Sequence, residues 1–317
     1  MEYRNLGRSG LVVSEVSVGS WLTLGSSVDR EGTREIVHRA FDLGVNLFDT
    51  ADVYSNGAGE EALGYALRGI PRRYVVIATK CFFPMSERPN DRGLSRKHIA
   101  ESIEGSLRRL GTDYVDLLQC HRFDPNTPVE ETVRAFDDLV RQGKVLYWGV
   151  SEWRAEQILE ACRCADAQRA VRPISNQPQY NMLSRGIEAE VIPMSRREGL
   201  AQLVFSPLAQ GALTGKYSGG QRPVGTRAAD AARNVFMTHF LEPGSLAKTD
   251  RLRPLADRLG ISLAQLALAW CLAEPNVASV ITGVTRVAQL EDNVKASGLR
   301  LSAEILERID AIFPRSS

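Results

Sequence analysis

The residues best suited to chemistry in this chain follow a short apolar run near residue 50. The stretch from 45 to 59 reads VNLFDTADVYSNGAG, and its VNLF portion predicts a buried strand. Asp49 follows that strand directly, and Tyr54 lies in the next turn, which is rich in Ser, Asn and Gly. An aspartate and a tyrosine placed this way could face one cleft, although the same pair is common in ordinary loops.

Two further titratable residues follow two other apolar runs. The run YVVIA is followed by Thr79 and Lys80, and the run VDLLQC is followed by His121. Taken singly, Lys80 could be a solvated strand end and His121 a loop histidine with its hydrogen bonds satisfied. If the strands before them are neighbours in a parallel sheet, both side chains join Asp49 and Tyr54 at one edge. That joint placement favours a functional site.

These four residue types suit the protonation of a substrate oxygen. An ordinary tyrosine has a pKa near ~10, too high for efficient acid–base catalysis near neutrality. A lysine ammonium ~4 Å away, at an effective dielectric of ~20, favours the phenolate by roughly 4 kcal/mol. We therefore expect Lys80 to lower the pKa of Tyr54 by up to ~3 units, less the cost of burial. Asp49 would keep Lys80 charged, and His121 could orient a carbonyl or relay a proton.

The elements that must position these residues alternate along the whole chain. Continuous short apolar runs predict parallel strands covered on both faces, and segments with helical spacing separate them. This pattern predicts an α/β fold, a (β/α)8 TIM barrel with an N-terminal β-hairpin (Tyr3 to Val13) and an extra C-terminal helix. The predicted strands are Val16–Val18, Val45–Phe48, Tyr74–Ala78, Val115–Cys120, Val145–Val150, Ile174–Gln177, Leu203–Phe205 and Ser279–Ile281. The predicted helices are Glu31–Leu43, Glu60–Leu67, Ser95–Gly111, Val129–Val140, Ala155–Ala165, Arg185–Arg197, Leu246–Leu259, Leu263–Ala273, Val287–Lys295 and Ala303–Ile312.

The composition argues against a nucleic-acid-binding, membrane-inserted or metal-binding protein. The 317 residues, 44% hydrophobic and 24% charged, suit one globular barrel domain spanning residues 1–317. Lys and Arg (39) balance Asp and Glu (38), so no global field predicts binding to nucleic acid. We expect no membrane insertion, since no apolar run is long enough. The five scattered cysteines predict reduced thiols in a cytoplasmic protein, and the four separated histidines predict no metal site.

One glycine motif is a decoy. Residues 57–62, GAGEEA, match the dinucleotide fingerprint G-x-G-x-x-A. The fingerprint requires its glycines directly after a strand, whereas eight residues intervene after Phe48. Glu60 and Glu61 would also place negative charge in the first turn of the helix, where it repels phosphate. We therefore predict no Rossmann fold.

By contrast, the glycine-rich segment from Gln210 to Gly244 predicts a mobile basic flap suited to phosphates, or else a solvated loop. Its basic residues are Lys216, Arg222, Arg227 and Arg233.

Several motifs resemble those of the aldo-keto reductases over essentially the whole chain. They are FDTADVYSNGAGEEALG, ATK at 78–80, DYVDLLQCHRFDPNTPVEET and SPLAQGALTGKY. DPNTPVEET and RQGKVLYWGVSEW are especially similar to the subgroup containing the voltage-gated potassium channel beta subunits and their bacterial relatives.

The resemblance implies a barrel that binds NADPH without a Rossmann domain and reduces a small aldehyde or ketone. It implies Tyr54 as the acid, supported by Lys80 and Asp49, with His121 placing the carbonyl. It also implies cofactor contacts along the cleft. These are Trp21, Thr23 and Asp49 near the first strands; Ser151, Asn176 and Gln177 at the carboxamide; Phe205 stacked on the nicotinamide; Ser206, Leu208, Gly211 and Lys216 at the pyrophosphate; and Arg227, Gly283, Thr285, Gln289, Asp292 and Asn293 around the adenosine.

Departures from the family pattern leave alternatives open. Glu152 stands where many reductases have Asn, so we assign it no carboxamide contact. An arginine that many members carry near Gln289 is absent, so NAD is an alternative to NADP. Channel subunits typically carry Asn at position 121, and His121 therefore favours a working catalyst over a redox-sensing regulatory subunit. An alcohol or sugar dehydrogenase acting in the oxidative direction remains a third hypothesis. The subgroup implies a homo-oligomer, a tetramer or octamer.

Overall fold

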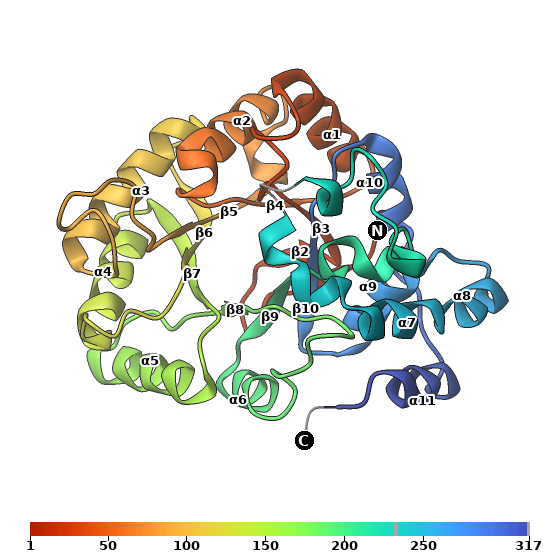
Figure 1. Ribbon diagram of the computed structural model, residues 1–317. Helices are drawn as coiled ribbons and strands as arrows, with labels where there is room; N and C mark the ends of the chain where they lie inside the picture. The colour runs from red at the N-terminus through yellow and green to blue at the C-terminus, as the bar shows by residue number, and fades with distance from the viewer. Residues whose placement is uncertain (231–233, 316–317) are drawn as a thin grey trace.

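A computed structural model describes residues 1–230 and 234–315, and in this part of the chain eight parallel strands close into a barrel (Figure 1). Each strand pairs with the next along the chain, and the last pairs with the first, in the order β10-β3-β4-β5-β6-β7-β8-β9. The predicted (β/α)8 barrel is confirmed. The strands are β3 (Val16–Gly19), β4 (Leu47–Asp49), β5 (Val76–Cys81), β6 (Val115–Cys120), β7 (Val145–Ser151), β8 (Ser175–Gln177), β9 (Ala201–Phe205) and β10 (Val277–Thr282).

Helices surround the strands as an outer ring (Figure 1). In α3, for example, Ile99, Ile103 and Leu110 fall on one face at helical spacing and are buried in the layer between strands and helices. Ser95 caps its N-terminus, and Gly111, with a φ of 67°, ends it in the left-handed conformation. The ring comprises α1 (Arg30–Asp42), α2 (Ala58–Ala66), α3 (Arg96–Leu110), α4 (Val129–Arg141), α5 (Ala155–Gln168), α6 (Val191–Glu198), α9 (Leu263–Ala273) and α10 (Val287–Val294), with α11 (Ala303–Ile312) as the extra C-terminal helix.

The N-terminal hairpin closes one end of the barrel. Its strands, β1 (Tyr3–Asn5) and β2 (Val12–Ser14), pair antiparallel, as predicted. Leu6 and Val13 are fully buried in a cluster with Leu47, Leu117 and Leu203 from the inner faces of the barrel strands. Because this end is filled with apolar side chains, an active site can form only at the opposite end, where the strands terminate.

Two predicted helices are wrong in extent, and a proline explains each error. The helix predicted from Arg185 to Arg197 is regular only as α6, from Val191. A continuous helix would place Pro193 in its interior, where the ring clashes with the carbonyl of the preceding turn. The helix predicted from Leu246 to Leu259 is divided into α7 (Pro243–Asp250) and α8 (Arg253–Leu259). Pro254 lies in the first turn of α8, where a missing N–H costs little.

The segment from Gln210 to Gly244 is more ordered than its glycines predict. It forms short 3₁₀ turns, namely η3 (Ala209–Thr214), η4 (Ser218–Gly220), η5 (Arg227–Ala229), η6 (Asn234–Phe236) and η7 (Thr238–Leu241). Leu213, Tyr217, Met237 and Phe240 are buried in one apolar cluster with residues of α7 and α9. These four side chains therefore attach the described part of the segment to α7 and α9. Arg233 lies outside the described residues.

The described helices include no single one with the length and apolar composition needed to cross a membrane. One pair of segments, 243–259 with 263–273, meets that requirement only when taken together, and it bends by 91° at the break.

Candidate active site

A buried ion pair lies at the C-terminal end of the barrel. The Nζ of Lys80, on β5, is 2.5 Å from Oδ1 of Asp49, which ends β4. The same Nζ donates to the carbonyl of Thr50 at 2.7 Å, and the Lys80 side chain is fully buried. Burial alone would lower the pKa of Lys80, but the Asp49 carboxylate and the Tyr54 hydroxyl together raise it above its ordinary value. Lys80 therefore stays charged inside the protein.

Tyr54 lies between this lysine and His121. The Lys80 Nζ is 4.9 Å from the centroid of the Tyr54 ring, and the His121 ring is 5.6 Å away, nearly perpendicular to it. Tyr54 opens η1 (Tyr54–Gly57), in which Ser55 and Asn56 both have positive φ. This tight turn brings the phenol back over the end of β4.

The predicted acidification of Tyr54 is wrong for this site. Burial raises the pKa of the phenol, the Lys80 ammonium lowers it, and the Asp49 carboxylate raises it again. The balance lies above the ordinary value because desolvation outweighs the attraction of the ammonium. The phenol is consequently protonated at neutral pH and holds a proton that it can donate. Lys80 limits the rise in pKa that burial alone would impose.

Two amides hold the Asp49 carboxylate on its other side. Gln177, at the end of β8, donates to Oδ2 at 2.8 Å, and Gln119, on β6, donates at 3.4 Å. The sequence interpretation placed Gln177 at the cofactor and missed Gln119. The signal for Gln119 was available, because it is a polar residue at an inward position of the apolar strand VDLLQC.

His121 follows β6 directly and is neutral. Burial lowers its pKa well below the ordinary range, and the charges of Lys80 and Arg122 lower it further. The edge of the ring packs against Phe83, with centroids 4.8 Å apart, and Nδ1 has no hydrogen-bond partner among the described residues. A neutral imidazole keeps one N–H, so His121 can donate one hydrogen bond to a substrate oxygen.

A cavity of about 1310 Å³ opens beside these residues. Asp49, Tyr54 and His121 lie on its wall, and Lys80 lies behind Tyr54. The predicted cofactor residues on the wall are Trp21, Thr23, Asp49, Ser151, Gln177, Phe205, Ser206, Leu208, Gly211, Lys216, Arg227, Gly283, Thr285, Gln289, Asp292 and Asn293.

Asn176 is the predicted cofactor residue that the structure places off the wall. Its side chain is fully buried and donates to Gln202 on the neighbouring strand at 3.2 Å. Successive residues of a strand face opposite sides, so Asn176 and Gln177 cannot both face the cavity.

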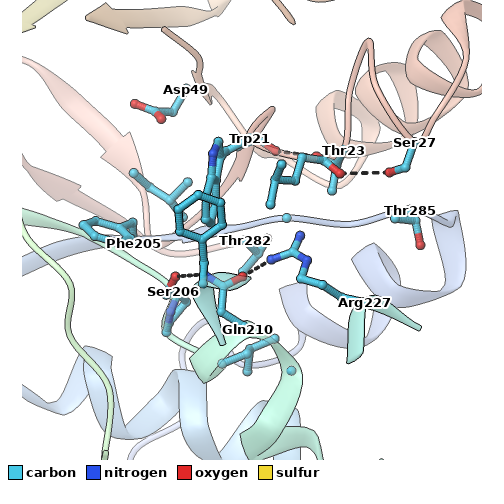
Figure 2. Close-up of a pocket in the computed structure, with 18 of the residues that line it drawn as sticks. Trp21, Thr23, Ser27, Asp49, Phe205, Ser206, Gln210, Arg227, Thr282 and Thr285 are labelled. Atoms are coloured by element: carbon cyan, nitrogen blue, oxygen red, sulfur yellow. Dashed lines mark hydrogen bonds between the residues drawn. The ribbon is translucent and has the colours of Figure 1, made fainter. Parts of the chain in front are cut away.

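Three cationic side chains, Lys216, Arg227 and Arg286, also line the cavity. Figure 2 shows Arg227 well away from Asp49, and we call the part of the cavity around Arg227 its outer end. Figure 2 shows Arg227 reaching toward Gln210, which in turn donates to the Ser206 hydroxyl at 2.7 Å. Arg227 also lies over the Trp21 ring, 5.6 Å from its centroid. Arg286 was missed from sequence, and it supplies a cation at the end where the family's usual arginine near Gln289 is absent.

The lining fits a nicotinamide dinucleotide. Ser151, which donates to the Gln177 backbone carbonyl, and Gln177, which donates to Asp49, keep oxygen acceptors for a carboxamide on the cavity wall. The Phe205 ring lies in the same cavity (Figure 2). The basic outer end suits phosphates. The volume exceeds that of an ordinary drug-sized pocket, which leaves room for a substrate beside a dinucleotide.

Strained backbone gathers around the same cavity. Residues other than glycine rarely adopt positive φ, and such outliers cluster where a site needs them. In this chain Leu22, Ser55, Glu152, Ser206 and Gln210 all have φ between 51° and 59°, and all five line the cavity. The fold therefore holds five positions of the cavity wall in a backbone conformation that residues other than glycine rarely adopt.

Two further buried carboxylates, Asp52 and Glu60, lie close to Tyr54 along the chain. Asp52 accepts from Ser102 on α3 at 2.9 Å and from the backbone N–H of Val53 at 2.7 Å. Nearby, Glu60 accepts from Thr79 at 2.5 Å and from Arg109 at 2.7 Å. Burial, followed by repulsion from Glu60, raises the pKa of Asp52 to about 7.

This shifted pKa predicts a pH dependence of stability. Since the folded-state pKa of Asp52 lies above its ordinary value of 3.8, the native protein holds a proton that the unfolded chain has lost between about pH 4 and pH 7. The free energy of unfolding should fall as pH rises through this window and level off above it. Urea unfolding at several pH values should show a shallower fall for Asp52→Asn, whereas Asp113→Asn, at an exposed position, should follow the wild type. Identical slopes in all three proteins would contradict this account.

Nearly the whole chain is similar to known proteins of one family. The sequence model described as "Aldo/keto reductase family" matches residues 15–313. A "Probable voltage-gated potassium channel subunit beta" from Oryza sativa subsp. japonica is 47% identical, over 98% of this chain and 96% of that protein. A protein of the same description from Arabidopsis thaliana is 46% identical, over 99% and 97%. A "Putative voltage-gated potassium channel subunit beta" from Schizosaccharomyces pombe is 43% identical, over 98% and 93%.

Proposed function

Because the chain belongs to the aldo/keto reductase family, and so to a family of oxidoreductases that act on carbonyl compounds with a nicotinamide cofactor, we propose that it is an NADPH-dependent reductase of small aldehydes and ketones. One observation carries the proposal. Tyr54, Lys80 and His121 meet beside a cavity large enough for a dinucleotide. The pKa directions, raised for Tyr54 and Lys80 and lowered for His121, favour a protonated phenol, a charged ammonium and a neutral imidazole, as reduction of a carbonyl requires.

In the proposed mechanism, bound NADPH supplies a hydride to the carbonyl carbon. Tyr54 donates its phenolic proton to the carbonyl oxygen as negative charge develops there. The Lys80 ammonium stabilises the phenolate that this transfer leaves, and Asp49 keeps Lys80 protonated and fixed in place. His121, neutral and with one N–H, donates a hydrogen bond to the same oxygen and so sets the orientation of the substrate. Asp49 and Thr50 hold Lys80 before substrate arrives, so its charge needs little reorganisation.

The preference for NADPH over NADH rests on the outer end of the cavity. Lys216, Arg227 and Arg286 supply cationic groups that can pair with a phosphate on the adenosine ribose. NAD is the alternative cofactor. Titration of the purified protein with each reduced cofactor, followed by tryptophan fluorescence, should give a smaller dissociation constant for NADPH.

A second candidate function comes from the printed names of the relatives. Proteins 43–47% identical to this chain are described as channel beta subunits, so a cofactor-bearing regulatory role is the competing proposal. His121, poised to orient a carbonyl, favours the catalyst. The oxidation of an alcohol or sugar hydroxyl would use the same groups in reverse.

We also propose, from the same subgroup, that the protein forms a homo-oligomer, which sedimentation analysis can test.

One assay separates these candidates. Purified protein mixed with NADPH and 4-nitrobenzaldehyde should lower the absorbance of the reduced cofactor steadily and in proportion to enzyme. A flat trace under conditions where fluorescence shows bound NADPH would favour the regulatory role. Running the assay with NADP and the corresponding alcohols measures the opposite direction. A larger kcat/KM there would make the protein a dehydrogenase.

A further inference from the structure

The cavity wall next to His121 carries a guanidinium group that the reaction proposed above does not use. Arg122 follows His121 directly and lines the cavity. Its Nη1 donates to the backbone carbonyl of His121 at 2.5 Å and lies 3.5 Å from the Ser151 hydroxyl. Over the described residues, no carboxylate forms an ion pair with Arg122, and its Nε and Nη2 make no hydrogen bond.

The other charges of the cavity are already engaged or distant. Asp49 and Lys80 neutralise each other. Glu152 is on the same wall, but its Oε1 accepts from the backbone N–H of Gln179. The basic residues at the outer end suit the cofactor phosphates. Over the described residues Glu152, like Arg122, forms no ion pair, and Arg122 is the cation beside the catalytic groups that no carboxylate neutralises.

Arg122 is also close enough to act on a molecule held by His121. Both side chains contact one ring, that of Phe83, with the His121 centroid at 4.8 Å and the Arg122 Cζ at 5.5 Å. The charge of Arg122 lowers the pKa of both His121 and Tyr54, so its field reaches the reacting groups. A small substrate whose carbonyl oxygen meets Tyr54 and His121 would extend past this guanidinium.

We propose that Arg122 binds an anionic group, a carboxylate or a phosphate, on the carbonyl substrate and makes this cavity selective for anionic aldehydes and ketones. The inference rests on the proposed reductase function. Guanidinium presents five donors in a planar fork that matches such anions, and the donors on Nε and Nη2 remain for a substrate. A neutral substrate would cover this cation without pairing it, whereas an anionic one would gain a charge-assisted hydrogen bond.

A matched pair of aldehydes tests the proposal. 4-Carboxybenzaldehyde carries an anion, and its methyl ester, methyl 4-formylbenzoate, has nearly the same shape without the charge. The measured quantity is the ratio of kcat/KM for the acid to that for the ester. Any effect on the His121 backbone touches both substrates and cancels in this ratio. Arg122→Gln should lower the ratio about tenfold to a hundredfold, as expected for loss of a charge-assisted hydrogen bond. The ratio for Arg122→Lys should lie between those of the wild type and Arg122→Gln, because lysine keeps the positive charge but not the planar arrangement of donors.

Arg134→Gln is the control, since it removes the same charge from an exposed position on α4, and its ratio should match the wild type. A second pair, 4-formylphenyl phosphate and 4-methoxybenzaldehyde, separates the sources of the anion. If Arg122→Gln lowers the charged-to-neutral ratio of kcat/KM more for this pair than for the first, the preferred anion is a phosphate. If it lowers the ratio more for the first pair, the preferred anion is a carboxylate. An Arg122→Gln ratio equal to the wild type in both pairs would overturn the inference while leaving the reductase function standing.

If the wild type reduces none of these aldehydes, the 4-nitrobenzaldehyde assay decides the reductase proposal and direct binding decides the inference. Terephthalate, a dicarboxylate that cannot be reduced under these conditions, would be titrated calorimetrically into the protein saturated with NADP. Binding that is weakened at least about tenfold by Arg122→Gln, and not by Arg134→Gln, supports an anion site at Arg122. No binding, or equal binding in all three proteins, overturns it.

Discussion

Replacing Tyr54 with phenylalanine should lower kcat by roughly a hundredfold to ten-thousandfold while leaving NADPH affinity within about twofold of the wild type. The ring would remain against Lys80 and His121, so the shape of the site is kept. What disappears is the proton that neutralises the developing oxyanion. Water cannot replace it efficiently, because a water molecule lacks the fixed position and the adjoining ammonium that the phenol has.

The readouts are steady-state turnover of 4-nitrobenzaldehyde and fluorescence titration with NADPH. Tyr65→Phe is the matched control. It removes the same hydroxyl from α2, where the hydrogen bond goes to Glu31 and not to the cavity, and should leave both quantities unchanged. If Tyr54→Phe weakened cofactor binding as much as turnover, the hydroxyl would be holding the cofactor and its role as the acid would be disproved.

The barrel was predictable because its signals are local. Most strands contain a short apolar run, and parallel pairing then places every strand's C-terminal residue on one rim. The polar β8, with the sequence SNQ, is the exception. Asp49, Lys80 and His121 follow from that argument alone. The two helices that were wrong in extent were wrong because apolar spacing was given more weight than Pro193 and Pro254. A proline changes a backbone hydrogen bond and a steric contact, and hydrophobic periodicity contains neither.

The electrostatics of the site were less predictable. Sequence could suggest that Lys80 lies near Tyr54, but the sign of the pKa shift depends on how completely both are removed from water. The structure shows that burial outweighs the ammonium. Arg286 was missed because its role depends on which way its loop faces, whereas strand alternation could have identified Gln119. Asn176 could have been excluded earlier, since it precedes Gln177 in an extended strand.

Replacing Lys80 with methionine should abolish most turnover and also destabilise the fold. Lys80 is fully buried and lies 2.5 Å from Asp49, so its removal leaves a carboxylate inside the protein without a cation. Breaking one partner of such a pair typically costs about 3–5 kcal/mol of unfolding free energy. Turnover should fall at least about a hundredfold, because the phenolate left by proton transfer loses its stabilising charge. Urea unfolding and the nitrobenzaldehyde assay measure the two effects separately.

The double variant with Asp49→Asn shows whether the ion pair causes the loss of stability. Asparagine removes the stranded charge and still presents a carbonyl oxygen to Gln177, so Lys80→Met with Asp49→Asn should be more stable than Lys80→Met alone. Its turnover should stay low, since no ammonium remains beside Tyr54. A Lys80→Met protein as stable as the wild type at neutral pH would mean that Asp49 is held by its amide donors and the Thr50 loop, and that Lys80 serves the phenol alone.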